Sequence, residues 1–80
     1  MIHPDDLTTF LTNTWSDAKV TVTDRTGTMD HYRVVVVSSA FEGVNLLNRQ
    51  RMVYKALSEP MADGRIHALE LSLATPSESA

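Results

Sequence analysis

The chain has 80 residues, a formal charge of −3 and no cysteine. This length corresponds to a single small domain, residues 1–80, with little depth for a substrate pocket. The absence of cysteine excludes a disulfide, a CxxC zinc site and a thiol nucleophile within this chain, so any thiolate ligands must come from a partner. There is no secretory leader pattern and no apolar run of roughly 18 residues, so we expect a soluble, cytoplasmic protein.

The first half of the chain predicts a helix and a hairpin. Residues 4–15 begin with proline and two aspartates and repeat apolar side chains at three- and four-residue steps, which is typical of a helix that lies on a sheet. Residues 19–24 alternate valine with lysine or threonine and predict a strand with one buried face. A polar loop with Gly27 should join it to a second strand, 31–38, whose four successive valines indicate burial of most of the strand.

The longest helix is predicted over residues 44–58, with Asn45 as its cap and Pro60 and Gly64 beyond its end. At 100° per residue, one narrow arc of this helix contains three apolar residues and one polar exception: Leu46, Gln50, Val53 and Leu57. Residues 65–75 alternate again, with leucines on the core side, and predict a third strand parallel to the second strand or to its neighbour. The order helix, strand, strand, helix, strand is an α+β layout with helices on one face of a three-stranded sheet. The terminal residues 1–3 and 77–80 are expected to fray.

Three cations on the long helix form the one candidate basic patch: Arg49, Arg51 and Lys55. The simplest interpretation is a solvated helix face. The functional alternatives are a negatively charged partner or the phosphates of a nucleic acid, which the overall negative charge opposes.

Catalysis is not predicted. Ser38, His67 and Asp63 supply the residue types of a hydrolytic triad, but no nucleophile elbow or oxyanion site accompanies them. We therefore expect a protein that is not an enzyme.

Several motifs, in order and at matching spacing, resemble the BolA-like protein family over residues 20–76. They are the run of valines ending at Ser38, Phe41-Glu42-Gly43, the long helix with Leu47-Asn48-Arg49-Gln50-Arg51, the Ile66-His67-Ala68-Leu69 motif, and Thr75-Pro76. The resemblance implies a fold similar to class II KH domains. This chain has Gln50 where the family often has histidine, and it stops where many members carry a further helix.

The resemblance also implies a role as partner of monothiol glutaredoxins in iron sensing or iron-sulfur cluster delivery. Glutaredoxin and glutathione would supply thiolates to a shared [2Fe-2S] cluster, and the BolA-like member a histidine, which falls here on His67. A second family ligand usually comes from the first hairpin loop; here the loop has neither histidine nor cysteine, and His31 at its edge is the weaker candidate. No cofactor is expected in the isolated chain, which should be a monomer or weak homodimer. The family is also described in terms of transcriptional regulation, so a DNA- or RNA-binding regulator is the alternative function.

Overall fold

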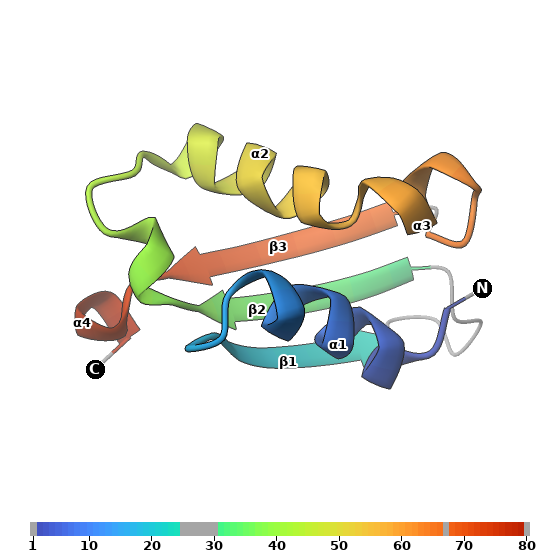
Figure 1. The fold of residues 1–80 in the computed structure, drawn as a ribbon, viewed down its shortest axis with the longest axis horizontal. Helices are drawn as coiled ribbons and strands as arrows, with labels where there is room; N and C mark the ends of the chain where they lie inside the picture. Colours follow the sequence, from blue (N-terminus) through green and yellow to red (C-terminus); the bar gives the residue numbers. More distant parts are fainter. Residues whose placement is uncertain (1, 25–30, 67, 80) are drawn as a thin grey trace.

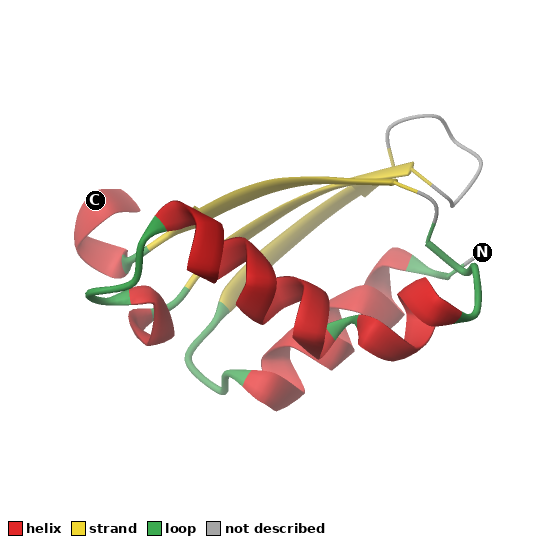
Figure 2. Cartoon of the chain, turned by 90° about the horizontal axis from the view of Figure 1, so that it is seen from above, coloured by secondary structure: helices red, strands yellow, loops and turns green. Residues whose placement is uncertain are grey.

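The computed structural model describes residues 2–24, 31–66 and 68–79, which form a three-stranded sheet with helices on one face (Figures 1 and 2). The elements in chain order are α1 (Pro4–Thr14), β1 (Lys19–Asp24), β2 (His31–Val37), the 3₁₀ helix η1 (Ser39–Phe41), α2 (Leu46–Ala56), α3 (Ser58–Ala62), β3 (Ala68–Ala74) and α4 (Pro76–Ser79). The predicted order is confirmed, and η1, α3 and α4 are additional short helices. Within the described residues, every helix is too short or too polar to cross a membrane.

Strand β2 lies at the centre of the sheet, antiparallel to β1 and parallel to β3. The sequence left open which strand would pair with the third one, and the structure shows that it is β2. Parallel neighbours need a long crossover connection, which α2 and α3 provide. The starts of β2 and β3 therefore lie at the same end of the sheet, on the right in Figure 1.

The core forms between the sheet and the helices because alternate residues of each strand face the helical layer. Val34 and Val36 of β2 are fully buried, and their partners in β3 are Leu71 and Leu73. Phe41 closes the junction between β2 and α2, as its sequence position predicts. The buried apolar residues are Ile2, Leu7, Leu11, Tyr32, Val34, Val36, Phe41, Val53, Leu57 and Ile66. The other two valines of the run are only partly buried, since the second face of the sheet has no helical cover.

The buried face of α2 differs from the predicted one. Asn45 does cap the helix, through a bond from the backbone amide of Asn48 to its side-chain oxygen. However, Leu46 is 67% exposed and Gln50 is also exposed, whereas Arg49 is buried. The buried arc is thus rotated toward Arg49, because this side chain has polar partners inside the molecule.

Both ends of the described chain, which begins at Ile2 and ends at Ser79, make contacts with the rest of the molecule. Ile2 is 4% exposed, and its backbone amide and carbonyl both bond to the hydroxyl of Tyr32. His3 caps α1 by accepting a bond from the amide of Asp5 at its Nδ1 atom. At the other end, Glu78 in α4 pairs with Arg49. The polar composition of these ends does not reveal the residues elsewhere in the chain to which they bind.

Candidate functional site

Of the two predicted ligands, the structure describes His31, which lies at the end of the sheet where β2 and β3 begin. His31 is the first residue of β2 and is exposed. Its register partner in β3 is Ala68, the residue that follows His67 in the sequence. His67 itself lies outside the described residues. The parallel pairing therefore brings the start of β3 beside His31, although the two strands begin more than thirty positions apart in the sequence.

The segment that leads into β3 is held by several contacts. Ile66 is buried, and its amide donates to the carbonyl oxygen of Pro60 at 3.2 Å. The guanidinium of Arg65 binds Asp63 at 2.8 Å and approaches Glu59 at 3.7 Å, and it lies 5.9 Å from the ring centroid of Phe10. The hydrogen bond from Arg65 also lowers the pKa of Asp63 below its usual value. These contacts give the chain a defined path into the strand.

The donor set of the chain fits a shared metal site better than a self-contained one. Within residues 2–24, 31–66 and 68–79, no three His, Cys, Asp or Glu side chains are grouped to hold a metal ion. An exposed imidazole at the start of a strand is held by the backbone and can still reach a neighbouring molecule. Together with the lack of cysteine, this arrangement suits a histidine offered to a metal whose other ligands belong to a partner.

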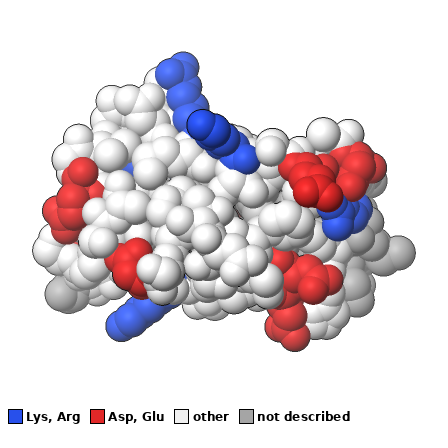
Figure 3. Space-filling view, in the orientation of Figure 1, with Lys and Arg blue, Asp and Glu red and all other residues white. Residues whose placement is uncertain are grey.

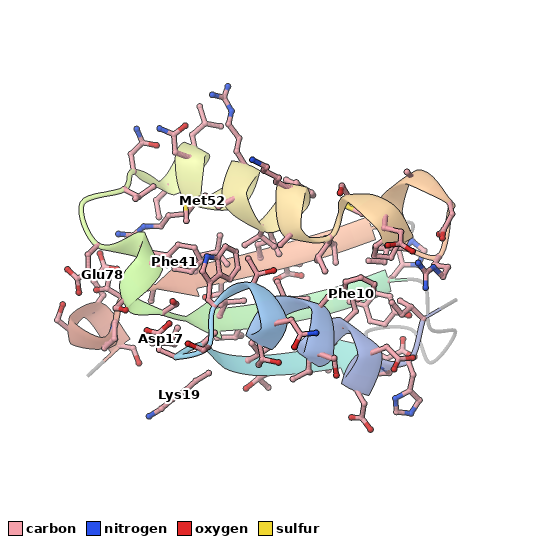
Figure 4. The ribbon with its side chains drawn as sticks, viewed as in Figure 1. Phe10, Asp17, Lys19, Phe41, Met52 and Glu78 are labelled. Atoms are coloured by element: carbon pink, nitrogen blue, oxygen red, sulfur yellow. The ribbon has the colours of Figure 1, made fainter. Side chains whose placement is uncertain are left out.

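Arg49 was predicted to bind a partner or a nucleic acid, and the structure places its side chain inside the molecule. Its side chain is 8% exposed, its Nε donates to the carbonyl of Val44 at 2.7 Å, and its Nη1 lies 2.7 Å from Oε1 of Glu78. Figure 4 labels Glu78 beside the short C-terminal helix. Glu78 also accepts from the amide of Thr75 at 2.8 Å. Arg49 therefore joins α2 to the C-terminal helix, and only Arg51 and Lys55 of the predicted patch remain exposed.

A second polar cluster, which the sequence analysis missed, lies at the opposite end of the sheet. Asp17 accepts from the hydroxyl of Ser38 at 2.8 Å and from the amide and hydroxyl of Ser39 at 2.8 and 2.6 Å. It thereby fixes the turn from β2 into η1. The sequence contained a signal for this cluster, namely two serines directly after β2 and an aspartate shortly before β1. Asp63 precedes β3 at the other end of the sheet, so Ser38 and Asp63 do not assemble into a triad.

These carboxylates make a testable prediction about pH. Hydrogen bonds from Ser39 lower the pKa of Asp17 to about 2, and the hydrogen bond from Arg49 lowers the pKa of Glu78 to about 2. A carboxylate with a lowered folded-state pKa stabilises the fold fully above its unfolded pKa, and the contribution disappears as the pH falls toward the folded value. We expect the urea midpoint to fall between about pH 5 and pH 2, and to fall less in the Asp17→Asn/Glu78→Gln double variant.

The matched control for this measurement is Glu42→Gln, on an exposed carboxylate. It should keep the pH profile of the unsubstituted protein. An equal slope for the double variant and the unsubstituted protein would contradict the assignment of acid sensitivity to Asp17 and Glu78.

Comparisons with known proteins agree with this architecture. The curated "BolA-like protein 1" of Mus musculus is 50% identical over 52 residues, which are 65% of this chain and 37% of that protein. The "DNA-binding transcriptional regulator BolA" of Escherichia coli is 42% identical over 52 residues, or 65% of this chain and 49% of the relative. The matched segment thus spans half or less of these relatives' own length.

Two solved structures have the same fold. BolA1 from Arabidopsis thaliana superimposes with a TM-score of 0.87 at 30% identity and covers all of both chains. The BolA domain of SufE1 from the same plant has a TM-score of 0.83 at 26% identity, and the alignment covers 94% of this chain and 93% of the SufE1 domain structure. The family model described as BolA-like protein matches residues 11–78. On this evidence, the chain belongs to the BolA-like protein family.

Proposed function

We propose that this chain is an adaptor that docks a monothiol glutaredoxin and offers His67 to a [2Fe-2S] cluster shared with that partner and glutathione. The observation that carries the proposal is the pairing of His31 with Ala68, in a chain without cysteine. This pairing supports the start of β2 and β3 as the place where a metal held by a partner would bind. His31 is the proposed second ligand. A BolA domain within SufE1 supports a role in protein interaction.

The chemistry of the ligands supports a sensing or delivery role. The shared cluster would supply one-electron redox chemistry and an exchangeable iron-sulfur unit. A protonated imidazole must lose a proton before one of its ring nitrogens can bind a metal, so the proposed site loses affinity as the pH falls through the histidine range. We propose iron sensing or cluster delivery in the cytoplasm as the setting.

The test is anaerobic reconstitution of the chain with a monothiol glutaredoxin and glutathione, followed by absorption and circular dichroism spectra. The unsubstituted chain should change the visible spectrum from that of glutaredoxin alone, and His67→Ala should abolish this change. His31→Ala should alter the spectrum less. His3→Ala is the matched control, because that histidine caps α1 and should leave the spectrum unchanged.

Binding of the two proteins without cluster, measured by calorimetry, separates docking from ligation. If His67→Ala gives the unsubstituted spectrum, His67 is not a ligand and the proposal fails. If the two proteins do not associate with or without cluster, the adaptor role itself fails.

A second candidate function is regulation through nucleic-acid binding. The printed name of the Escherichia coli relative and the exposure of Arg51 and Lys55 favour it. It predicts retention of DNA or RNA at low salt that weakens as salt rises, with a further loss in Arg51→Glu and Lys55→Glu. Arg49→Met should not change the salt dependence of nucleic-acid binding, since Arg49 is bound to Glu78 and makes no phosphate contact in this hypothesis. No retention at low salt would exclude this function.

A further inference from the structure

A groove on the helical layer lies between the end of α1 and the middle of α2, away from the proposed metal site. It has a volume of about 490 Å³ and is lined by Thr14, Trp15, Met52, Lys55 and Ala56. Trp15, Met52 and Ala56 are partly buried and pack against the core, so their outer surfaces give the groove an apolar floor. Trp15 is held in place by the edge-to-face contact with Phe41, with ring centroids 5.4 Å apart.

Lys55 is the charged residue among the described residues that line this groove. Helix α2 contains no Asp or Glu, and Arg51 and Lys55 lie one turn apart on its exposed side. Neither of the two forms an ion pair within the described residues. Figure 3 shows the same face, with an uncharged band across the helical layer and basic side chains at the α2 margin. The chain as a whole has a net charge of −3, whereas the exposed side of α2 next to the groove is positively charged.

The acidic residues near α1 do not neutralise this rim. Asp5 and Asp6 lie in the first turn of α1, roughly 14 Å along the helix from Thr14 at 1.5 Å per residue. Asp17, beyond the end of α1, directs its carboxylate to Ser38 and Ser39. Glu78 is bound to Arg49. Arg51 and Lys55 are therefore left to meet negative charge from another molecule.

We propose that this groove binds an amphipathic helix of a partner protein, with apolar residues toward Trp15 and Met52 and carboxylates toward Arg51 and Lys55. Two helices already bound the groove, and a third can pack across them with its side chains between their ridges. The apolar floor favours a helix over a phosphate backbone, which would need cations along its whole length. The proposal goes beyond the cluster-sharing function and uses a different face of the molecule.

Trp15 is the single tryptophan of the chain, so its fluorescence reports directly on the groove. The probe is a synthetic amphipathic helical peptide with a leucine face, flanking glutamates and no aromatic residue. A second peptide carries lysine in place of each glutamate. We expect a saturable blue shift of Trp15 emission with the acidic peptide at low salt, and much weaker binding of the basic peptide.

The Arg51→Glu/Lys55→Glu double variant should weaken binding of the acidic peptide about tenfold or more and favour the basic one, because it replaces two attractive charge contacts with two repulsive ones. Lys19→Glu is the matched control, since Lys19 is exposed on β1 and does not line the groove. Far-UV circular dichroism verifies that each variant is folded. His67→Ala should bind the peptide as the unsubstituted chain does, so failure of the metal-site proposal leaves this measurement intact.

Three outcomes would overturn the inference: equal affinity for the two peptides, an equal loss in the Lys19→Glu control, or no change in Trp15 emission. If a single-stranded oligonucleotide displaces the acidic peptide and binds more tightly through Lys55, the groove is a nucleic-acid surface and the partner-helix proposal is wrong.

Discussion

Substitution of Arg49 by methionine is expected to lower the free energy of unfolding by about 2–4 kcal/mol. Methionine keeps much of the side-chain volume but removes the donors to the carbonyl oxygens of Val44 and Leu73, which lie 2.7 and 3.4 Å away. It also removes the guanidinium that lies over Phe41 and pairs with Glu78. Urea unfolding followed by far-UV circular dichroism measures the loss.

Arg51→Met is the matched control for this prediction, because Arg51 is exposed on the same helix. Its effect should stay within about 0.5 kcal/mol. Equal effects of the two substitutions would mean that Arg49 is not the structural link between α2 and α4. A spectrum of the glutaredoxin complex that changes more with Arg51→Met than with Arg49→Met would further support a structural role for Arg49.

Truncation of Phe41 to alanine should be more damaging, with a loss of about 3–5 kcal/mol. Phe41 is fully buried between β2 and α2, and its ring contacts both Trp15 and Arg49. A domain of this size has a total stability of about 4–12 kcal/mol, so this one change removes a large part of it. Urea unfolding gives the magnitude, and Trp15 fluorescence reports the loss of the ring contact.

The exposed aromatic Tyr54 provides the comparison, since it is 40% exposed on α2. Tyr54→Ala should lower stability by less than about 1.5 kcal/mol. If Phe41→Ala does not fold, Phe41→Leu keeps the apolar volume and should retain the fold with a smaller loss. A Phe41→Ala protein as stable as Tyr54→Ala would show that the strand-helix junction does not depend on this ring.

Most of the local structure follows from sequence patterns. The alternation in residues 19–24 and the leucine repeat of β3 correspond to strands with one buried face. Gly43 has a φ of 70° and Gly64 a φ of 81°, a backbone conformation that glycine adopts readily and other residues rarely do. These features depend on side-chain periodicity and on backbone freedom at single positions, so neighbouring residues suffice to predict them.

The burial of individual charged residues could not be predicted in the same way. Arg49 and Glu78 are 29 positions apart, and Asp17 and Ser38 are 21 apart. The helical projection gave α2 a buried arc of Leu46, Gln50, Val53 and Leu57, with Arg49 on its flank. Val53 and Leu57 are buried as predicted, whereas Leu46 and Gln50 are exposed and Arg49 is buried. Only the packing of α4 beside the end of β3 supplies the carboxylate that makes burial of Arg49 favourable.

The sequence by itself determined the order of the helices and strands, the leucine and valine faces of the core and the lack of thiolate ligands within this chain. Tertiary structure decided the parallel register that sets His31 opposite Ala68, the partners of Arg49 and Asp17, and the groove beside Trp15. The reason is the range of the interactions involved. Periodicity and turn preference act over a few residues, whereas register, ion pairs and grooves arise from segments that meet only after the chain has folded.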